Sequence, residues 1–165
     1  MEKLKKEGLG YESFVISITD PTDDPLFPGD TDRRTCHQFY DIEPRTDGEM
    51  DELVLIYPAM LPVDAVRMVK LIRRAHASPH DEVLYVNCEA GISRSGAVAD
   101  FVQNVCRLPW EDFKRDNAHI FPNAHVKRLL REAWECIGCS WDATRGMRVT
   151  RPPQHTCGTY ASERG

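Results

Sequence analysis

A cysteine and an arginine lie in one short run of the chain, Cys88-Glu89-Ala90-Gly91-Ile92-Ser93-Arg94-Ser95, with five residues between them. A cysteine thiolate is a strong nucleophile, and a guanidinium presents parallel N–H donors that match two oxygens of a phosphate group. A single loop that carries both groups can hold an oxyanion and attack it. Gly91 suits the sharp bend that such a loop requires.

The flanking residues predict a strand before this loop and a helix after it. The run 83–86 is apolar and rich in β-branched and aromatic residues, which is typical of a buried strand. A helix is predicted from Arg94 to Leu108. Backbone N–H groups and the dipole at a helix start favour a bound anion, and they favour the thiolate form of Cys88. We therefore expect a phosphate-binding loop at a switch point of an α/β sheet.

Two other interpretations of the loop are weaker. Gly91 and Gly96 have the spacing of a nucleotide-binding loop, but Ala97 and Val98 stand where that motif needs Lys and Ser or Thr. A buried structural cysteine is the commoner role of a lone Cys. The joint occurrence of Cys, Gly, Arg and Ser at a strand-to-helix turn favours a functional role instead.

The run from Cys88 to Ser95 resembles the signature loop of the cysteine-based protein tyrosine phosphatases, above all their compact dual-specificity-like branch with its small bacterial and phage members. Three further stretches resemble that branch, over roughly residues 11 to 138: Val15-Ile16-Ser17-Ile18, Phe39-Tyr40-Asp41-Ile42, and Ile120-Phe121-Pro122-Asn123 with the helix that follows. The resemblance implies an α/β fold with a central, mostly parallel sheet flanked by helices.

The resemblance also implies an activity: metal-independent hydrolysis of phosphotyrosine in a protein or peptide, with phosphoserine and phosphothreonine as further substrates, and no cofactor. Cys88 would be the nucleophile. Arg94 and the backbone N–H groups from Glu89 through Arg94 would bind the phosphate. Ser95 would help the cysteine leave, and Asn123 would brace the phosphate loop.

Such a reaction needs an acid that protonates the departing oxygen. Asp41 is our assignment, from the resemblance and from its place near the end of a strand predicted over residues 35–42. Glu43, Asp47 and Asp51 lie in the same acidic stretch and are rivals.

One departure from the family pattern leaves an alternative function open. The family usually has His immediately before the nucleophile, where this chain has Asn87. Asn can donate a hydrogen bond but carries no charge, so a catalytically impaired phosphate-binding module is the alternative. A redox-responsive protein, in which Cys88 pairs with a second cysteine such as Cys36, is a third hypothesis.

The composition is that of an ordinary globular domain: 165 residues, 41% hydrophobic and 28% charged. The net charge of −5 argues against nucleic acid or an anionic membrane as the main partner. No run has the length of a transmembrane helix, and Met1 to Glu7 contain no apolar signal core, so we expect a cytoplasmic protein. We expect one catalytic domain over residues 1–139 and a polar tail over 140–165.

Two clusters of candidate metal ligands are interpreted as structural. Cys136 and Cys139 have a CxxC spacing with His155 and Cys157 downstream, but Cys136 falls within a helical pattern, so we expect reduced cysteines and no metal. The acidic stretch 20–30 lacks the ligand spacing of a calcium loop, so we expect a solvated surface there.

Two further helices are predicted. One covers residues 62–76, with Val63, Val66, Val69, Ile72 and Ala75 as its apolar face. The last helix has an apolar stripe of Val126, Leu129, Leu130, Ala133, Trp134 and Ile137, and we expect it to stop at Gly138.

Overall fold

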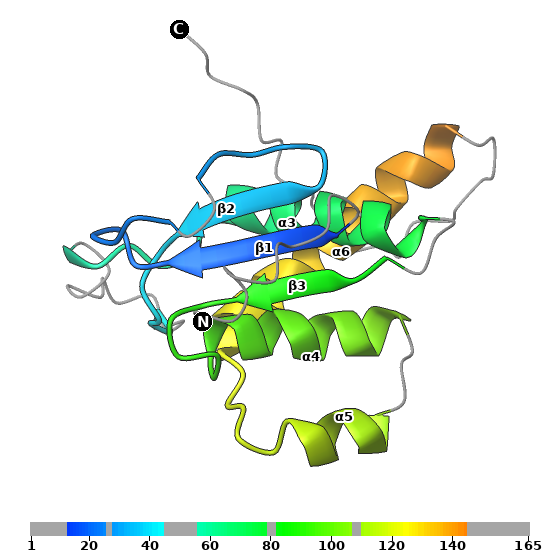
Figure 1. Ribbon diagram of the computed structural model, residues 1–165. Coiled ribbons are helices and arrows are strands. Elements are labelled where there is room, and N and C mark those ends of the chain that lie inside the picture. Colours follow the sequence, from blue (N-terminus) through cyan, green and yellow to red (C-terminus); the bar gives the residue numbers. More distant parts are fainter. Residues whose placement is uncertain (1–12, 26–27, 45–55, 79–81, 107–109, 145–165) are drawn as a thin grey trace, which may run out of the picture.

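The computed structural model describes residues 13–25, 28–44, 56–78, 82–106 and 110–144, with the backbone alone for residues 110 and 138–144. Its strands β1 (Phe14–Thr19), β2 (Arg34–Gln38) and β3 (Leu84–Asn87) form a parallel sheet in the order β2-β1-β3. The helices are α3 (Pro62–His76), α4 (Arg94–Cys106), α5 (Trp110–Asp116) and α6 (Ala124–Thr144) (Figure 1). The expected α/β class is therefore confirmed.

The central strand β1 is buried along nearly its whole length, on both sides of the sheet. A nearly continuous apolar run, interrupted in β1 by the buried Ser17, is typical of a central strand of a parallel sheet. The strand fixes the register of its neighbours, because Ser17 lies opposite Cys36 of β2 and opposite Asn87 of β3.

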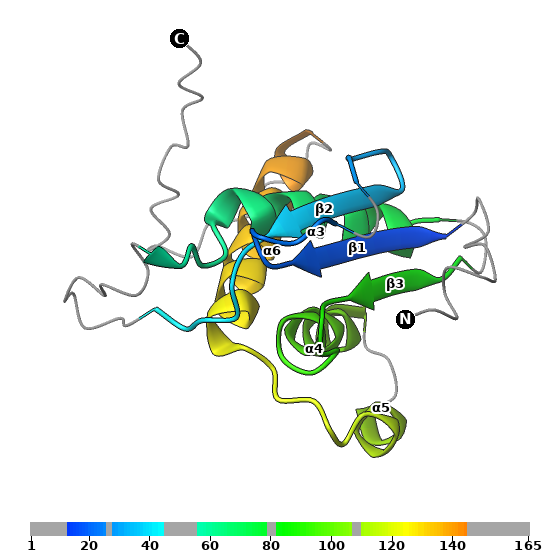
Figure 2. The same ribbon diagram turned by 60° about the vertical axis from the view of Figure 1, so that its left-hand side comes forward.

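The three long helices share one core with the sheet. In Figures 1 and 2, α6 passes behind the sheet beside α3, and α4 lies next to β3. The predicted apolar stripe of α6 is confirmed, with Trp134 and Ile137 partly buried against the core. Phe14, Ile16 and Ile18 point from β1 into this core, whose buried helical residues are Ala65, Met68, Val69, Leu71, Ile72, Ala97, Val98, Phe101, Val126, Leu129, Leu130 and Ala133.

All three strands point the same way, so their carboxyl ends lie at one edge of the sheet (Figure 1). The chain leaves β3 at this edge and turns directly into α4. This edge is where a parallel sheet places ligand-binding loops.

Three sequence-based expectations about element bounds and faces are wrong. The second strand ends at Gln38 rather than near residue 42, because the Tyr40 N–H bonds to the Pro58 carbonyl and not to β1. Helix α6 continues through Gly138 to Thr144, since a glycine inside a helix weakens it without ending it. Val63 of α3 is exposed, because steps of three residues drift around a helix with 3.6 residues per turn.

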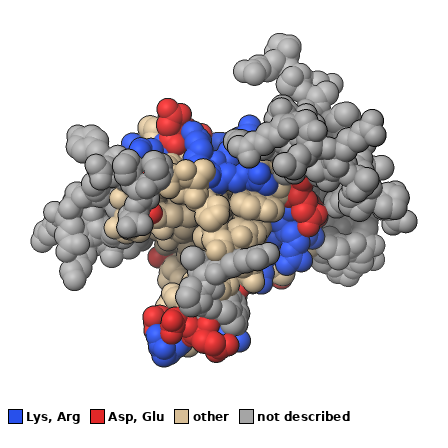
Figure 3. All heavy atoms as spheres, turned by 90° about the vertical axis from the view of Figure 1, so that its right-hand side faces the viewer, with Lys and Arg blue, Asp and Glu red and all other residues tan. Residues whose placement is uncertain are grey.

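Helix α5 lies beyond α4, at the lower end of the molecule in Figure 1. Figure 3 shows acidic and basic side chains together at that lower end. Two ion pairs join them, from Arg115 to Asp112 at 2.9 Å and to Asp116 at 3.1 Å. Exposed pairs of this kind contribute little to stability, so α5 is a charged surface element.

None of the helices in the described ranges combines the length and the apolar character that crossing a membrane requires.

A buried polar pair links β2 to α3. Nδ1 of the buried His37 donates to Oδ1 of Asp64 at 2.9 Å, and Oδ2 of Asp64 accepts from the Leu61 N–H at 3.1 Å. Burial alone would raise the pKa of Asp64, but these hydrogen bonds and nearby positive charge outweigh burial and hold the pKa below its usual value. The ionised carboxylate therefore stabilises the folded state.

Replacement of Asp64 by Asn should lower the free energy of unfolding near neutral pH by about 1–3 kcal/mol, because a charged acceptor is lost. A depressed pKa stabilises the fold above the usual carboxyl value of 3.8, and this contribution disappears as the pH falls through the lower, folded value. Urea unfolding of both proteins across the acidic range should show the difference shrinking. The exposed Asp24→Asn variant is the control, and a difference that does not change with pH would contradict the prediction.

Candidate active site

The structure brings together the cysteine, the arginine and the serine that the sequence singles out. Cys88 follows β3 directly, and Arg94 is the first residue of α4. The Sγ atom of Cys88 lies 3.0 Å from Oγ of Ser95 and 3.5 Å from the Ser95 backbone nitrogen. All three residues are only 5% exposed. The thiol therefore lies at a helix start, beside the hydroxyl and the backbone N–H of Ser95.

The loop between Cys88 and Arg94 bends at the predicted glycine. Gly91 has a φ of +70°, in the left-handed region that side chains with a Cβ rarely adopt. A Cβ at this position would meet nothing within 4 Å, so conformation rather than space requires glycine. The loop closes onto α4 through the Ser93 carbonyl, which accepts from the Ala97 N–H at 2.8 Å.

Arg94 is buried and is held at one of its terminal nitrogens. Nη1 donates to Oδ1 of Asp20 at 2.5 Å and to the carbonyl oxygen of Phe39 at 2.6 Å. Nε is also buried, but it makes no hydrogen bond within the described residues. A buried cation that keeps an unpaired donor is suited to bind an anion.

Asp41 lies after the end of β2 and is in direct contact with Ser93 of the loop. Ser93 Oγ donates to Oδ1 of Asp41 at 2.8 Å, and Asn123 Nδ2 donates to the same oxygen at 2.9 Å. No hydrogen bond within the described residues uses Oδ2.

Asn123 links the segment that carries Asp41 to the start of α6. Its Oδ1 accepts from the Val126 N–H at 2.9 Å, which caps the helix, and its Nδ2 also approaches the Ile42 carbonyl at 3.3 Å. The predicted bracing residue therefore contacts the Asp41 segment with its side chain, while its backbone N–H lies 3.4 Å from the Ser93 carbonyl of the loop.

Of the other three candidate acids, Glu43 lies within the described residues. Glu43 accepts from the Ala124 N–H at 2.6 Å, so its carboxylate is engaged at the start of α6. Asp47 and Asp51 lie outside the described residues.

Asn87 ties the end of β3 to β1, because its Nδ2 donates to Ser17 Oγ at 3.4 Å. Ser17 stands between Asn87 and Cys36 in the sheet. Adjacent strands are about 4.8 Å apart, so Cys36 lies two strands, about 10 Å, from Asn87. A disulfide needs Cα atoms within about 7 Å, which disfavours a direct Cys36–Cys88 pair in this fold.

The sequence gives no functional role to Asp20, yet this residue contacts Arg94. The stretch 20–30 was expected to be a solvated surface, which holds for the exposed Asp23 but not for Asp20, whose side chain is 25% exposed. One signal could have found it: Asp20 directly follows β1 just as Cys88 directly follows β3, and parallel strands end at the same edge.

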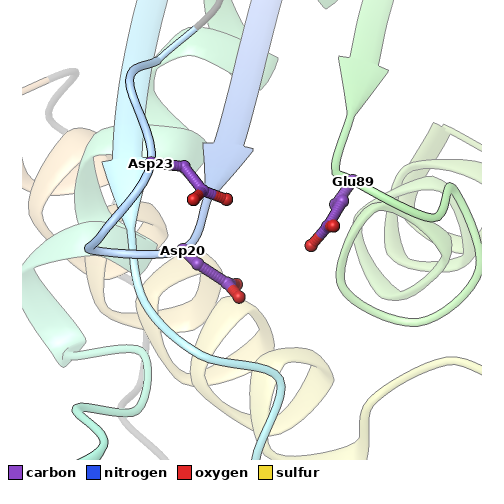
Figure 4. Close-up of side chains that lie close together, drawn as sticks. All are labelled: Asp20, Asp23 and Glu89. Carbon is purple, nitrogen blue, oxygen red and sulfur yellow. The ribbon is translucent and has the colours of Figure 1, made fainter.

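Asp20 also belongs to a group of three carboxylates. Oxygens of Asp20, Asp23 and Glu89 lie within 4.8 Å of one another, and Figure 4 shows the three side chains turned toward a common space between two loops. Among the described residues this is the group that could share a cation, although Asp20 already has Arg94 as its counter-ion. Of the CxxC cluster, the side chains of Cys139, His155 and Cys157 lie outside the described residues.

Searches against models of known protein families and against curated proteins return no match for this chain. Its function must therefore be inferred from the chemistry of the loop and its neighbours.

Removal of the Asn123 side chain should destabilise the protein, because α6 loses its cap and Asp41 loses a donor. We expect Asn123→Ala to lower the free energy of unfolding by about 1–2 kcal/mol in urea titrations. Asn123→Ser should lose less, since Ser also caps helices well. Equal losses in the two variants would mean that the cap does not contribute.

Proposed function

We propose that this chain is a metal-independent phosphatase of the cysteine-based type, which hydrolyses phosphotyrosine in proteins or peptides and accepts phosphoserine and phosphothreonine as further substrates. The observation that carries the proposal is the joint placement of Cys88 and Arg94 at the two ends of one loop at the start of α4, both buried. A nucleophile and an oxyanion-binding cation in that arrangement suit phosphoryl transfer.

In the first step, the Cys88 thiolate attacks phosphorus in line with the ester oxygen. The S–P bond forms as the P–O bond to the leaving group breaks. Arg94 and the loop N–H groups stabilise the equatorial oxygens. Asp41 donates its proton to the leaving oxygen, and a phosphocysteine remains. The contact of Asp41 with Ser93 supports this role, since it holds the acid against the loop.

In the second step, water attacks the phosphocysteine. Asp41, now ionised, takes a proton from the water, the S–P bond breaks and inorganic phosphate leaves. The Cys88 thiolate is the leaving group of this step. The hydroxyl of Ser95, with Oγ 3.0 Å from Sγ, supports its departure by donating to the developing charge.

Two features near the loop favour an aromatic phosphate ester. Ile92 in the loop is 38% exposed, and Phe121, whose N–H bonds to the Ile92 carbonyl at 3.2 Å, is 76% exposed. Exposed apolar side chains beside a phosphate site suit the ring of phosphotyrosine. Glu89 and the absence of Lys from the loop disfavour polyphosphorylated lipids and RNA 5′ ends as substrates.

The alternative is a phosphate-binding module with impaired catalysis. The observation that favours it is the hydrogen bond from Asn87, the residue immediately before Cys88, to Ser17 of β1. An uncharged side chain that joins two strands supplies no positive charge to the nucleophile. Binding would then persist through Arg94 without turnover.

The first test is hydrolysis of an aryl phosphate in the presence of EDTA. Wild type should turn over, and Cys88→Ser should be inactive because it lacks the nucleophile. Asp41→Asn should lower kcat by about a hundredfold, the usual contribution of a general acid.

Each result separates the two functions. An inert wild type that still binds a phosphate analogue would identify the binding module. Loss of wild-type activity in EDTA would contradict a metal-independent reaction, and full activity of Asp41→Asn would exclude Asp41 as the acid.

Ser95→Ala should slow the second step more than the first, because the hydroxyl assists departure of Cys88. Rapid mixing with excess aryl phosphate should then show a burst of phenol equal to the enzyme concentration, followed by slow turnover. A uniform slowing without a burst would contradict this role of Ser95.

A further inference from the structure

We propose that Asp20 is a positioning residue, which holds the Arg94 guanidinium so that one edge faces the substrate phosphate. This inference rests on the proposed function, because it assigns a role to a residue of the same site. It concerns a carboxylate that the sequence pattern does not link to the loop.

The contacts of Arg94 define which edge is held. A guanidinium offers its bidentate edge through Nε and Nη2, whereas Nη1 points away from that edge. Both observed acceptors, Oδ1 of Asp20 and the Phe39 carbonyl, contact Nη1. Nε makes no hydrogen bond within the described residues although it is buried. Asp20 therefore fixes the plane of the guanidinium while it leaves the bidentate edge for two phosphate oxygens.

Burial makes this contact effective. The Arg94 side chain is 6% exposed and that of Asp20 is 25% exposed, so water screens the pair weakly. A flexible arginine loses rotamer freedom when it binds an anion. An arginine already held by two acceptors has lost that freedom in advance, which favours binding.

If Asp20 acted only through its charge, its neutralisation would have the opposite effect on anion binding. Asp20 is one of three carboxylates whose oxygens lie within 4.8 Å of one another, with Asp23 and Glu89 (Figure 4). Removal of any negative charge near a phosphate site should strengthen anion binding by electrostatics alone. If Asp20 positions Arg94, its neutralisation should weaken binding instead.

The experiment measures binding of tungstate, a tetrahedral oxyanion that is not hydrolysed, by calorimetry. Asp20→Asn should raise the Kd by about tenfold or more, the effect of one lost charge-assisted interaction. Asp23→Asn is the matched control, because Asp23 lies in the same carboxylate group and makes no described contact with Arg94. It should bind as tightly as wild type or more tightly.

A second comparison tests whether the effect passes through the guanidinium. In an Arg94→Lys background, where no bidentate edge exists, Asp20→Asn should cause no further loss of tungstate binding. An equal further loss would overturn the proposal. So would Asp20→Asn binding at wild-type strength or tighter, or equal weakening in Asp20→Asn and Asp23→Asn.

Loss of a buried counter-ion can also unfold a protein, so thermal unfolding of each variant is recorded. If Asp20→Asn does not fold, the wild type decides the question through the NMR signal of the Arg94 Nε–H, assigned by its absence in Arg94→Lys. The signal should shift on addition of tungstate. An unchanged signal would overturn the proposal, because the Nε–Nη2 edge that Asp20 leaves free would not be the one that binds the anion.

These results separate the inference from the phosphatase itself. A wild type that binds tungstate but hydrolyses nothing would contradict the proposed phosphatase activity. The tungstate Kd values of the variants would still decide the role of Asp20. An active wild type whose Asp20→Asn variant binds normally would contradict only the role of Asp20. A wild type that does neither would overturn both.

Discussion

The parallel direction of three short strands determines which residues can lie together at the candidate site. Just after each strand ends, one group of the candidate site lies at the same edge of the sheet. Asp20 follows β1, the Phe39 carbonyl follows β2, and Cys88 follows β3. Arg94 then starts α4 at that edge and is bonded to the ends of both β1 and β2. An antiparallel arrangement would separate these groups by the length of a strand.

Several features of the fold follow from sequence because local chemistry controls them. Gly91 adopts the positive φ that a sharp bend demands, and α3 begins at Pro62, where the missing N–H costs nothing. The apolar stripe of α6 has the i, i+3, i+4 pattern and is buried as expected. The stripe chosen for α3 advances by three at every step, and the real buried face includes Met68 and Leu71, which that choice omitted.

The loop of the candidate site could be predicted from the sequence, whereas the residues that contact the loop were harder to predict. Cys88, Arg94 and Ser95 lie within one short run, and their residue types led to the proposal of phosphate chemistry. The partner of Arg94 lies 74 positions earlier, and its place directly after β1 is the one local feature that distinguishes Asp20 from the exposed acids that follow it. Only strand order and direction bring it near, and these depend on long-range pairing. The end of β2 was likewise set by Pro58, a distant backbone acceptor that no local pattern indicates.

The register of β3 affects when the sheet can form while the chain is being synthesised. Leu84 pairs with Phe14, so β1 keeps an unpaired edge until the second half of the chain has emerged from the ribosome. Contacts between residues so far apart in sequence form slowly. Until then Asp20 has no counter-ion from α4, and Cys88 has no helix start beside it. A nascent or truncated chain that ends before α4 therefore contains all three strands and Cys88 but lacks Arg94 and Ser95, so the candidate site is assembled only when α4 is present.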